Sequence, residues 1–119
     1  MSYDISLVHP VTREVLTVEH PHEITGGTYA LGGTRNLWLN VTYNYAPHFY
    51  RTIDPEKGIR AIYGLTGEES IPLFNASLEQ LADDYDQDYW APTEGNAKAA
   101  LLGLREFARL RPDGVWEGD

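Results

Sequence analysis

The chain has 119 residues, no cysteine and a net charge of −9 at neutral pH. This length corresponds to one domain, which we predict to span residues 1–119. The lack of cysteine excludes disulfides and thiolate metal sites, and the negative charge argues against direct binding of nucleic acid or of anionic membranes. No apolar run approaches the ~20 residues of a membrane span, and the first residues lack a signal-peptide pattern, so a cytoplasmic location is expected.

The N-terminal half, residues 1–46, is predicted to be rich in β-structure. Apolar and polar residues alternate over 3–7, which is the period of a half-buried strand. Residues 9–13 are typical of a turn and residues 14–19 of a hairpin partner for the first strand. The segment His20-Pro21-His22 is predicted to end that partner strand, because proline cannot donate a hydrogen bond to a β-ladder.

Residues 37–45 form the strongest predicted strand, and its two faces differ in character. The predicted apolar row consists of Leu37, Leu39, Val41, Tyr43 and Tyr45. The opposite row consists of Trp38, Asn40, Thr42 and Asn44.

The C-terminal half, residues 47–119, is predicted to be helical. Pro47 suits the first turn of a short helix, and a second helical turn is expected over residues 59–63. The pattern Thr66-Gly67-Glu68-Glu69 matches a capping box that begins a longer helix, and Thr93 is the expected N-cap of the last helix. The order of elements predicts an α+β fold, a small antiparallel sheet with two to four helices packed on one face.

Two Gly-Gly-Thr sequences precede the strongest strand and mark the best candidate for a ligand site. Paired glycines let the backbone approach a ligand closely, and successive N–H groups in such turns can bind an anion. Two tight turns of a hairpin are the alternative interpretation. The two sequences are Gly26-Gly27-Thr28 and Gly32-Gly33-Thr34.

The polar row of residues 38–44 supports the same hypothesis. Its amides and hydroxyl offer uncharged donors and acceptors, which suit a sugar, a base edge or a phosphate ester. An aromatic side chain would stack on a base and arginines would neutralise phosphate, whereas an ordinary solvent-facing strand is the alternative. The predicted ligand-binding residues are Gly26, Gly27, Thr28, Gly32, Gly33, Thr34, Arg35, Trp38, Asn40, Thr42, Asn44, Tyr45, His48, Arg51 and Arg60.

Catalysis, cofactors and metals have little support in the sequence. His48 is the one weak candidate for a general acid or base, and no serine or threonine stands in a nucleophile context. His20 and His22 would need a third, distant ligand to hold a metal. We therefore expect no metal and no cofactor, and an enzyme is the third hypothesis, below two kinds of binding protein.

Residues 68–94 form an acidic stretch without lysine or arginine. A solvated face is one interpretation, and a surface that docks on a basic partner protein is the other. The repeat of aspartates resembles the start of a calcium loop, but the positions of its glycine and final glutamate do not match, so an EF-hand is excluded. The acidic residues are Glu68, Glu69, Glu79, Asp83, Asp84, Asp86, Asp88 and Glu94.

Four segments, GGTYALGGT, NVTYNYAPHFY, PTEGNAKAALLGL and RPDGVWEGD, resemble those of an uncharacterised family of small proteins from phages, prophages and bacteria. The resemblance implies a viral or mobile-element context and brings no catalytic residues. In that context the first hypothesis is a homo-oligomeric, anti-defence protein of the host cytoplasm that sequesters a nucleotide-like or other phosphorylated ligand without turnover. The alternatives are an acidic inhibitor of a host defence protein and a nucleotide-processing enzyme.

Overall fold

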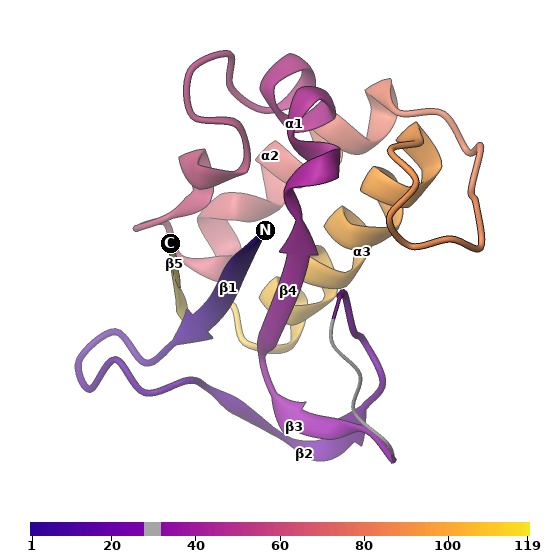
Figure 1. Cartoon of the computed structure of the whole chain (residues 1–119). Coiled ribbons are helices and arrows are strands. Elements are labelled where there is room, and N and C mark those ends of the chain that lie inside the picture. The colour runs from indigo at the N-terminus through magenta and orange to yellow at the C-terminus, as the bar shows by residue number, and fades with distance from the viewer. Residues whose placement is uncertain (28–31) are drawn as a thin grey trace.

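The computed structural model describes residues 1–27 and 32–119, and it confirms the predicted α+β class (Figure 1). No helix in these described ranges is both long and apolar enough to cross a lipid bilayer. The elements in chain order are β1 (Ser2–Val8), β2 (Thr17–His22), β3 (Thr34–Asn36), β4 (Trp38–Thr42), the 3₁₀ turn η1 (Tyr43–Tyr45), α1 (Ala46–Thr52), the 3₁₀ turn η2 (Gly58–Ile62), α2 (Gly67–Gln80), α3 (Glu94–Leu110) and β5 (Val115–Gly118).

The main sheet is antiparallel and contains three strands in the order β4-β1-β5, while β2 and β3 form a separate two-stranded ribbon. Tyr3 lies opposite Val41, and Leu7 lies opposite Trp116. The C-terminal strand β5 was not predicted, because four residues after a helix show too little alternation to identify. It joins the two halves of the chain in one sheet, so residues 1–46 and 47–119 do not fold as separate units.

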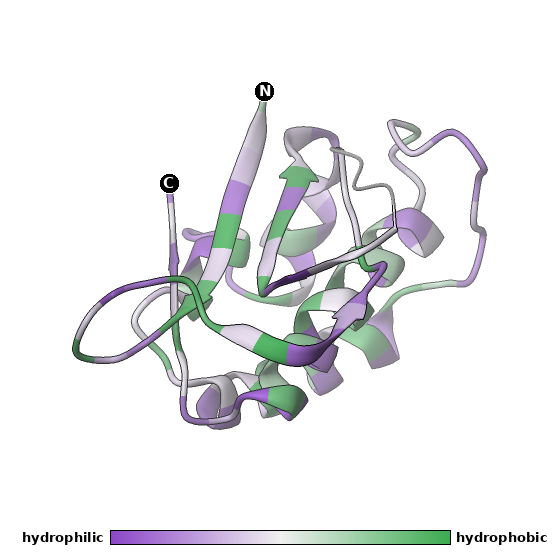
Figure 2. Cartoon of the chain, turned by 90° about the horizontal axis from the view of Figure 1, so that it is seen from below, coloured by the Kyte–Doolittle hydropathy of each residue, from purple (hydrophilic) through white to green (hydrophobic). Residues whose placement is uncertain are grey.

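The alternation along β1 sets which face of the sheet is buried (Figure 2). Its odd-numbered side chains point into the core, and Ile5 and Leu7 are fully buried there. The helices α2 and α3 cover this face (Figure 1), and Phe74 of α2 meets Trp116 of β5 edge to face, with ring centroids 6.0 Å apart. Each fully buried side chain of this size contributes about 1.5–3 kcal/mol to the free energy of unfolding.

The ribbon branches from the main sheet at three leucines. Leu7 N–H donates to Leu37 O, Leu37 N–H to Leu16 O, and Leu16 N–H to Leu7 O, each at 2.9–3.0 Å. The prediction that residues 14–19 pair with β1 is therefore wrong beyond Leu16, because the chain turns there and β2 pairs with β3. β2 ends at His22, within the segment His20-Pro21-His22 that was predicted to end it. Pro21 itself belongs to the strand, because a missing donor is tolerated in an edge strand.

The strand predicted over residues 37–45 ends at Thr42. The hydroxyl of Thr42 accepts the Asn44 N–H at 3.2 Å and caps η1. A local side-chain bond to the backbone thus replaces the β-ladder. Tyr45 is still buried, but it projects from a 3₁₀ turn rather than from a strand.

The helix starts follow the sequence prediction. Thr66 and Glu69 form a capping box at α2, with the Glu69 N–H donating to the Thr66 hydroxyl at 3.1 Å and the Thr66 N–H donating to the Glu69 carboxylate at 2.9 Å. Thr93 caps α3 by accepting the Asn96 N–H at 3.0 Å. These bonds satisfy donors that have no partner inside the helix.

The capping box predicts a loss of stability in acid. Hydrogen bonds from the Thr66 backbone and hydroxyl lower the pKa of Glu69 below its ordinary value. A lowered folded-state pKa stabilises the fold above the unfolded-state pKa of about 4.3, and this contribution is lost as the pH falls through the folded-state pKa. In urea denaturation, the free energy of unfolding of Glu69→Gln should therefore be lower than that of the parent at about pH 7 and equal to it at about pH 3.

The matched control is Glu106→Gln, which removes an exposed carboxylate from α3. Its effect on stability should be small at both pH values. A Glu69→Gln deficit that persisted unchanged in acid would contradict the role given to the carboxylate.

Candidate functional site

The free edge of β4 is covered by two segments that are distant in sequence. The hydroxyl of Tyr89 donates to Asn40 O at 3.1 Å and accepts the Thr42 N–H at 2.9 Å. On the same edge, Gly27 N–H donates to Asn40 O at 3.0 Å. One tyrosine hydroxyl and one short loop therefore satisfy backbone groups that an edge strand otherwise exposes.

Close contact with β4 explains the first glycine pair. A Cβ atom on Gly26 would lie 1.5 Å from Asn40 O, and one on Gly27 would lie 2.5 Å from the Asn40 side-chain oxygen. The second pair has a different cause, since Gly32 and Gly33 adopt positive φ angles of 76° and 85°. Thr28, which was predicted to bind ligand, lies outside the described residues.

Two amides of the predicted polar row, Asn40 and Asn44, bond to other parts of the chain. Asn40 is 9% exposed, and its amide donates to Ser2 Oγ at 2.6 Å and to Asp4 Oδ1 at 2.8 Å. The amide of Asn44 donates to Trp90 O at 2.8 Å. The alternative of a solvent-facing strand is therefore wrong for Asn40, whose donors are occupied by neighbouring residues.

His48 continues this set of contacts from α1. Arg51 donates to His48 Nδ1 at 3.0 Å and pairs with Glu94 at 3.4 Å. Because arginine can only donate, Nδ1 is the acceptor and Nε2 carries the proton. His48 Nε2 therefore donates to Pro92 O, at 2.8 Å, and both ring nitrogens are engaged by protein groups.

Asn96 organises the segment between α2 and α3, residues 82–93, which we name the acidic loop. Its side chain is 3% exposed. It accepts the Asp86 N–H at 2.9 Å and donates to Asp88 O at 2.9 Å and to Ala91 O at 3.1 Å. These three hydrogen bonds of one buried amide thus fix the shape of a loop that contains no helix or strand.

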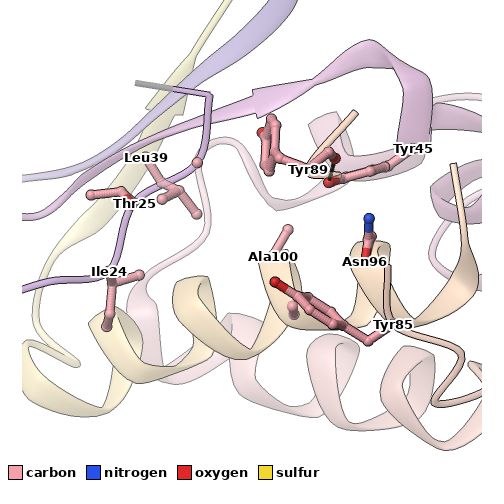
Figure 3. A pocket seen from close by; sticks show the side chains of 10 residues that line it. Ile24, Thr25, Leu39, Tyr45, Tyr85, Tyr89, Asn96 and Ala100 are labelled. Carbon is pink, nitrogen blue, oxygen red and sulfur yellow. Dashed lines mark hydrogen bonds between the residues drawn. The ribbon is translucent and has the colours of Figure 1, made fainter. Parts of the chain in front are cut away.

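A cavity of about 120 Å³ lies between β4, α3 and the acidic loop, and we name it the tyrosine cavity (Figure 3). In Figure 3 the side chain of Ala100 points from α3 toward Tyr45 and Tyr89, while Tyr85 lies across the helix. The lining residues are Ile24, Thr25, Gly26, Leu39, Tyr45, Tyr85, Tyr89, Asn96, Ala99 and Ala100.

The three tyrosines of the cavity differ in burial and bonding. The Tyr45 hydroxyl donates to Tyr89 O, and the two rings meet edge to face with centroids 5.6 Å apart. Tyr85 is 66% exposed, and its hydroxyl contacts no hydrogen-bond partner within residues 1–27 and 32–119. Tyr85 therefore forms the side of the cavity that faces solvent.

Burial shifts the pKa of both inner tyrosines upward. It raises the pKa of the Tyr45 hydroxyl well above the ordinary value, and the neighbouring Tyr89, Tyr85 and Asp88 add to this shift. Burial also raises the pKa of Tyr89, against the opposing effect of its bonds to Thr42 and Gly27. Both groups remain hydrogen-bond donors at neutral pH, as the bonds to Tyr89 O and Asn40 O require.

The predicted site residues fall into separate groups. Gly26 and Tyr45 line the cavity. The three predicted arginines lie on different elements, β3, α1 and η2, and none of them lines it. Arg60 is engaged elsewhere, 4.9 Å from the ring centroid of Tyr3 and donating to Asp119 O at 2.8 Å.

Two further predicted residues lie away from the cavity. Trp38 sits opposite Ser6 on the sheet face turned away from the core. Thr34 accepts the Asn36 N–H at 3.1 Å within β3. Among the predicted aromatic and hydroxyl residues that the structure describes, Tyr45 is the one that lines the tyrosine cavity.

Most residues of the cavity wall were not predicted from the sequence. Tyr85 and Tyr89 were considered only as part of an acidic stretch, and Asn96 only as part of a helix. One sequence signal for this wall was available. It was an asparagine in the first turn of an amphipathic helix that follows a loop with several aromatic residues. Nothing in the sequence indicated that this loop returns to the edge of β4.

No protein-family model matches the chain, and no curated protein or solved structure matches it significantly. The interpretation of the site therefore depends on its geometry.

Removal of the Tyr89 hydroxyl is expected to open the edge of β4. Tyr89→Phe leaves Thr42 N–H without its partner and Asn40 O with one bond fewer, at a cost of about 1–3 kcal/mol in the free energy of unfolding. Tyr85→Phe is the control, since it removes a hydroxyl that contacts no described partner, and should cost less than about 0.5 kcal/mol. Equal effects of the two variants in urea denaturation would contradict the role of Tyr89.

Proposed function

We propose that this protein binds a small molecule by enclosing one planar ring of it in the tyrosine cavity, and that it releases the molecule unchanged. The observation that carries the proposal is the cavity itself, which three tyrosines line beside the small side chains of Ala99 and Ala100. An aromatic wall with few polar groups is the usual composition of a ligand pocket.

The volume of the cavity limits the size of the enclosed group. At about 120 Å³ it is slightly smaller than an engineered apolar cavity of about 150 Å³ that binds benzene. A single six-membered ring, such as a phenyl group or a pyrimidine, is the largest unit that we expect inside it. Edge-to-face contacts with Tyr45 and Tyr89 would favour an aromatic ring over an aliphatic one.

The chemical groups of the lining favour binding without turnover. The lining residues include no carboxylate, imidazole or amine in the part of the chain that the structure describes. His48, the predicted acid or base, is held by Arg51 and Pro92 outside this lining. The exposed Tyr85 hydroxyl is a polar group that could orient a ligand at the cavity mouth.

We retain the predicted base-like ligand, but we no longer expect its phosphate to contact residues of the cavity. A nucleoside would place its base among the tyrosines and leave its sugar outside. The homo-oligomer, the phage context and the role against host defence stay predictions.

Benzyl alcohol, as a neutral single-ring probe, tests the proposal. Titration followed by ¹H–¹⁵N NMR should shift the Asn96 side-chain amide and the amides of residues 99–100. Ala100→Leu should weaken binding at least about tenfold, because it fills the cavity. Ala99→Leu, at the exposed mouth, provides a second variant if Ala100→Leu fails to fold.

Ala76→Leu is the matched control, because it makes the same change on an exposed face of α2. It should leave binding unchanged. No shift at the cavity with the parent protein, or equal binding by Ala76→Leu and Ala100→Leu, would contradict the proposal.

A second candidate function, an acidic inhibitor that binds a basic protein, is favoured by the exposed face of the acidic loop. Trp90 is 49% exposed and Tyr85 66% exposed there, and these are residue types enriched at interaction hot spots. Asn96 holds the loop in one shape, which reduces the entropy lost on binding. The surrounding carboxylates would attract a partner of opposite charge.

The second candidate predicts a partner that depends on charge. Wild-type protein and a variant with Asp84, Asp86 and Asp88 changed to lysine should be compared as baits, after circular dichroism has shown that both are folded. A host protein retained by the wild type alone, and released as salt screens the charges, is the expected result. Equal retention by both baits would reject this candidate.

A further inference from the structure

Acidic residues are the sequence neighbours of two tyrosines that line the tyrosine cavity. Two of its tyrosines, Tyr85 and Tyr89, belong to the acidic loop. Asn96, also in the lining, is bonded to the backbone of the same loop. The cavity wall and the carboxylates are thus parts of one hydrogen-bonded unit. The exposed aspartates that alternate with these lining residues are Asp84, Asp86 and Asp88.

The charge of this unit is only partly compensated by cations. Lys98 pairs with Asp83 at 2.7 Å, and Arg51 pairs with Glu94, the first residue of α3, at 3.4 Å. The three aspartates between them form no ion pair within the described residues. No lysine or arginine occurs in the sequence between Arg60 and Lys98.

Backbone donors hold these three aspartates in place. Asp84 accepts the Gly95 N–H at 3.0 Å, Asp86 accepts the Asp88 N–H at 2.7 Å, and Asp88 accepts the Trp90 N–H at 3.1 Å. The three carboxylates are therefore held at fixed places in the loop that supplies two of the cavity's tyrosines.

Asp88 acts electrostatically on one residue of the cavity wall. Burial is the main cause of the raised pKa of Tyr45, whose ring lines the cavity, and Asp88 is the smallest of the causes that add to it. An electric field that disfavours a negative charge on Tyr45 also disfavours an anionic ligand beside it and favours a cationic one. The faces of tyrosine rings attract ammonium groups for the same electrostatic reason.

We propose that the ligand of the tyrosine cavity is an organic ammonium ion, with its ring among Tyr45, Tyr85 and Tyr89 and its positive charge facing the aspartates of the acidic loop. The inference rests on the proposed function and names the ligand class of the same cavity. An arylalkylamine has the required chemistry, whereas a nucleotide phosphate or a carboxylate would be repelled.

Three probes of nearly equal shape test the sign of the charge: benzylamine, benzyl alcohol and benzoate. Isothermal titration and NMR near neutral pH should rank the cation first, at least about fivefold tighter than the alcohol, and benzoate last. Raising the salt concentration should weaken the binding of benzylamine and leave that of the alcohol unchanged.

Substitution of Asp84, Asp86 and Asp88 by asparagine removes the charge and keeps the oxygen that accepts each backbone N–H. This variant should bind benzylamine about as weakly as it binds benzyl alcohol, while its affinity for the alcohol stays that of the parent. Glu106→Gln, a charge removed from the exposed face of α3, should leave the preference for the cation intact.

The outcomes separate the two proposals. Binding of the alcohol at the cavity with no preference for the amine would overturn the charge inference and leave the proposed function standing. Binding of none of the three probes would overturn both. A cation preference that survives the triple asparagine substitution would overturn the assignment to these aspartates.

Discussion

The candidate site depends on closure of the outer edge of β4. An exposed strand edge presents unpaired N–H and C=O groups, and here the hydroxyl of Tyr89 serves as both acceptor and donor for two of them. That contact brings the acidic loop from beyond α2 back to the sheet, over the first turns of α3. Together with the hydrogen bonds of Asn44 and Asn96 to the same loop, it holds Tyr89 and the backbone that receives the Tyr45 hydroxyl above the helix. The cavity is a consequence of how the edge is closed.

Much of the fold could be predicted because it follows from local rules. The period of β1, the capping box at Thr66 and the N-cap at Thr93 each depend on a few neighbouring residues. The long-range features could not be predicted, since strand β5 and the branch at Leu16 depend on which distant segments meet. For the site, Gly26 and Tyr45 were identified, but as part of a phosphate site whose arginines do not converge on the cavity.

The polar row shows why a pattern of residue types does not decide between ligand binding and structure. Amides and hydroxyls at alternate positions of a strand are as useful for holding another part of the chain as for holding a sugar. Asn40 binds β1, and Asn44 holds the backbone of the acidic loop. The two features considered separately in the sequence, the polar row and the acidic stretch, are two sides of one contact. Such a polar row differs from a ligand site only in the group that its side chains bind, and the sequence does not identify that group.

The small side chains of α3 explain why a cavity remains after the edge is closed. A Cβ on Gly103 would lie 2.7 Å from Ile24, so at that turn the incoming loop fills the space over the helix. One turn earlier, Ala99 and Ala100 leave space that three tyrosines enclose from the side and above. Tyr45 and Tyr89 reach this space with rigid rings whose hydroxyls are held by hydrogen bonds, so these two rings cannot collapse inward as flexible side chains would. An unfilled volume costs stability, and a chain that needed only stability could remove this one with a larger residue at position 100.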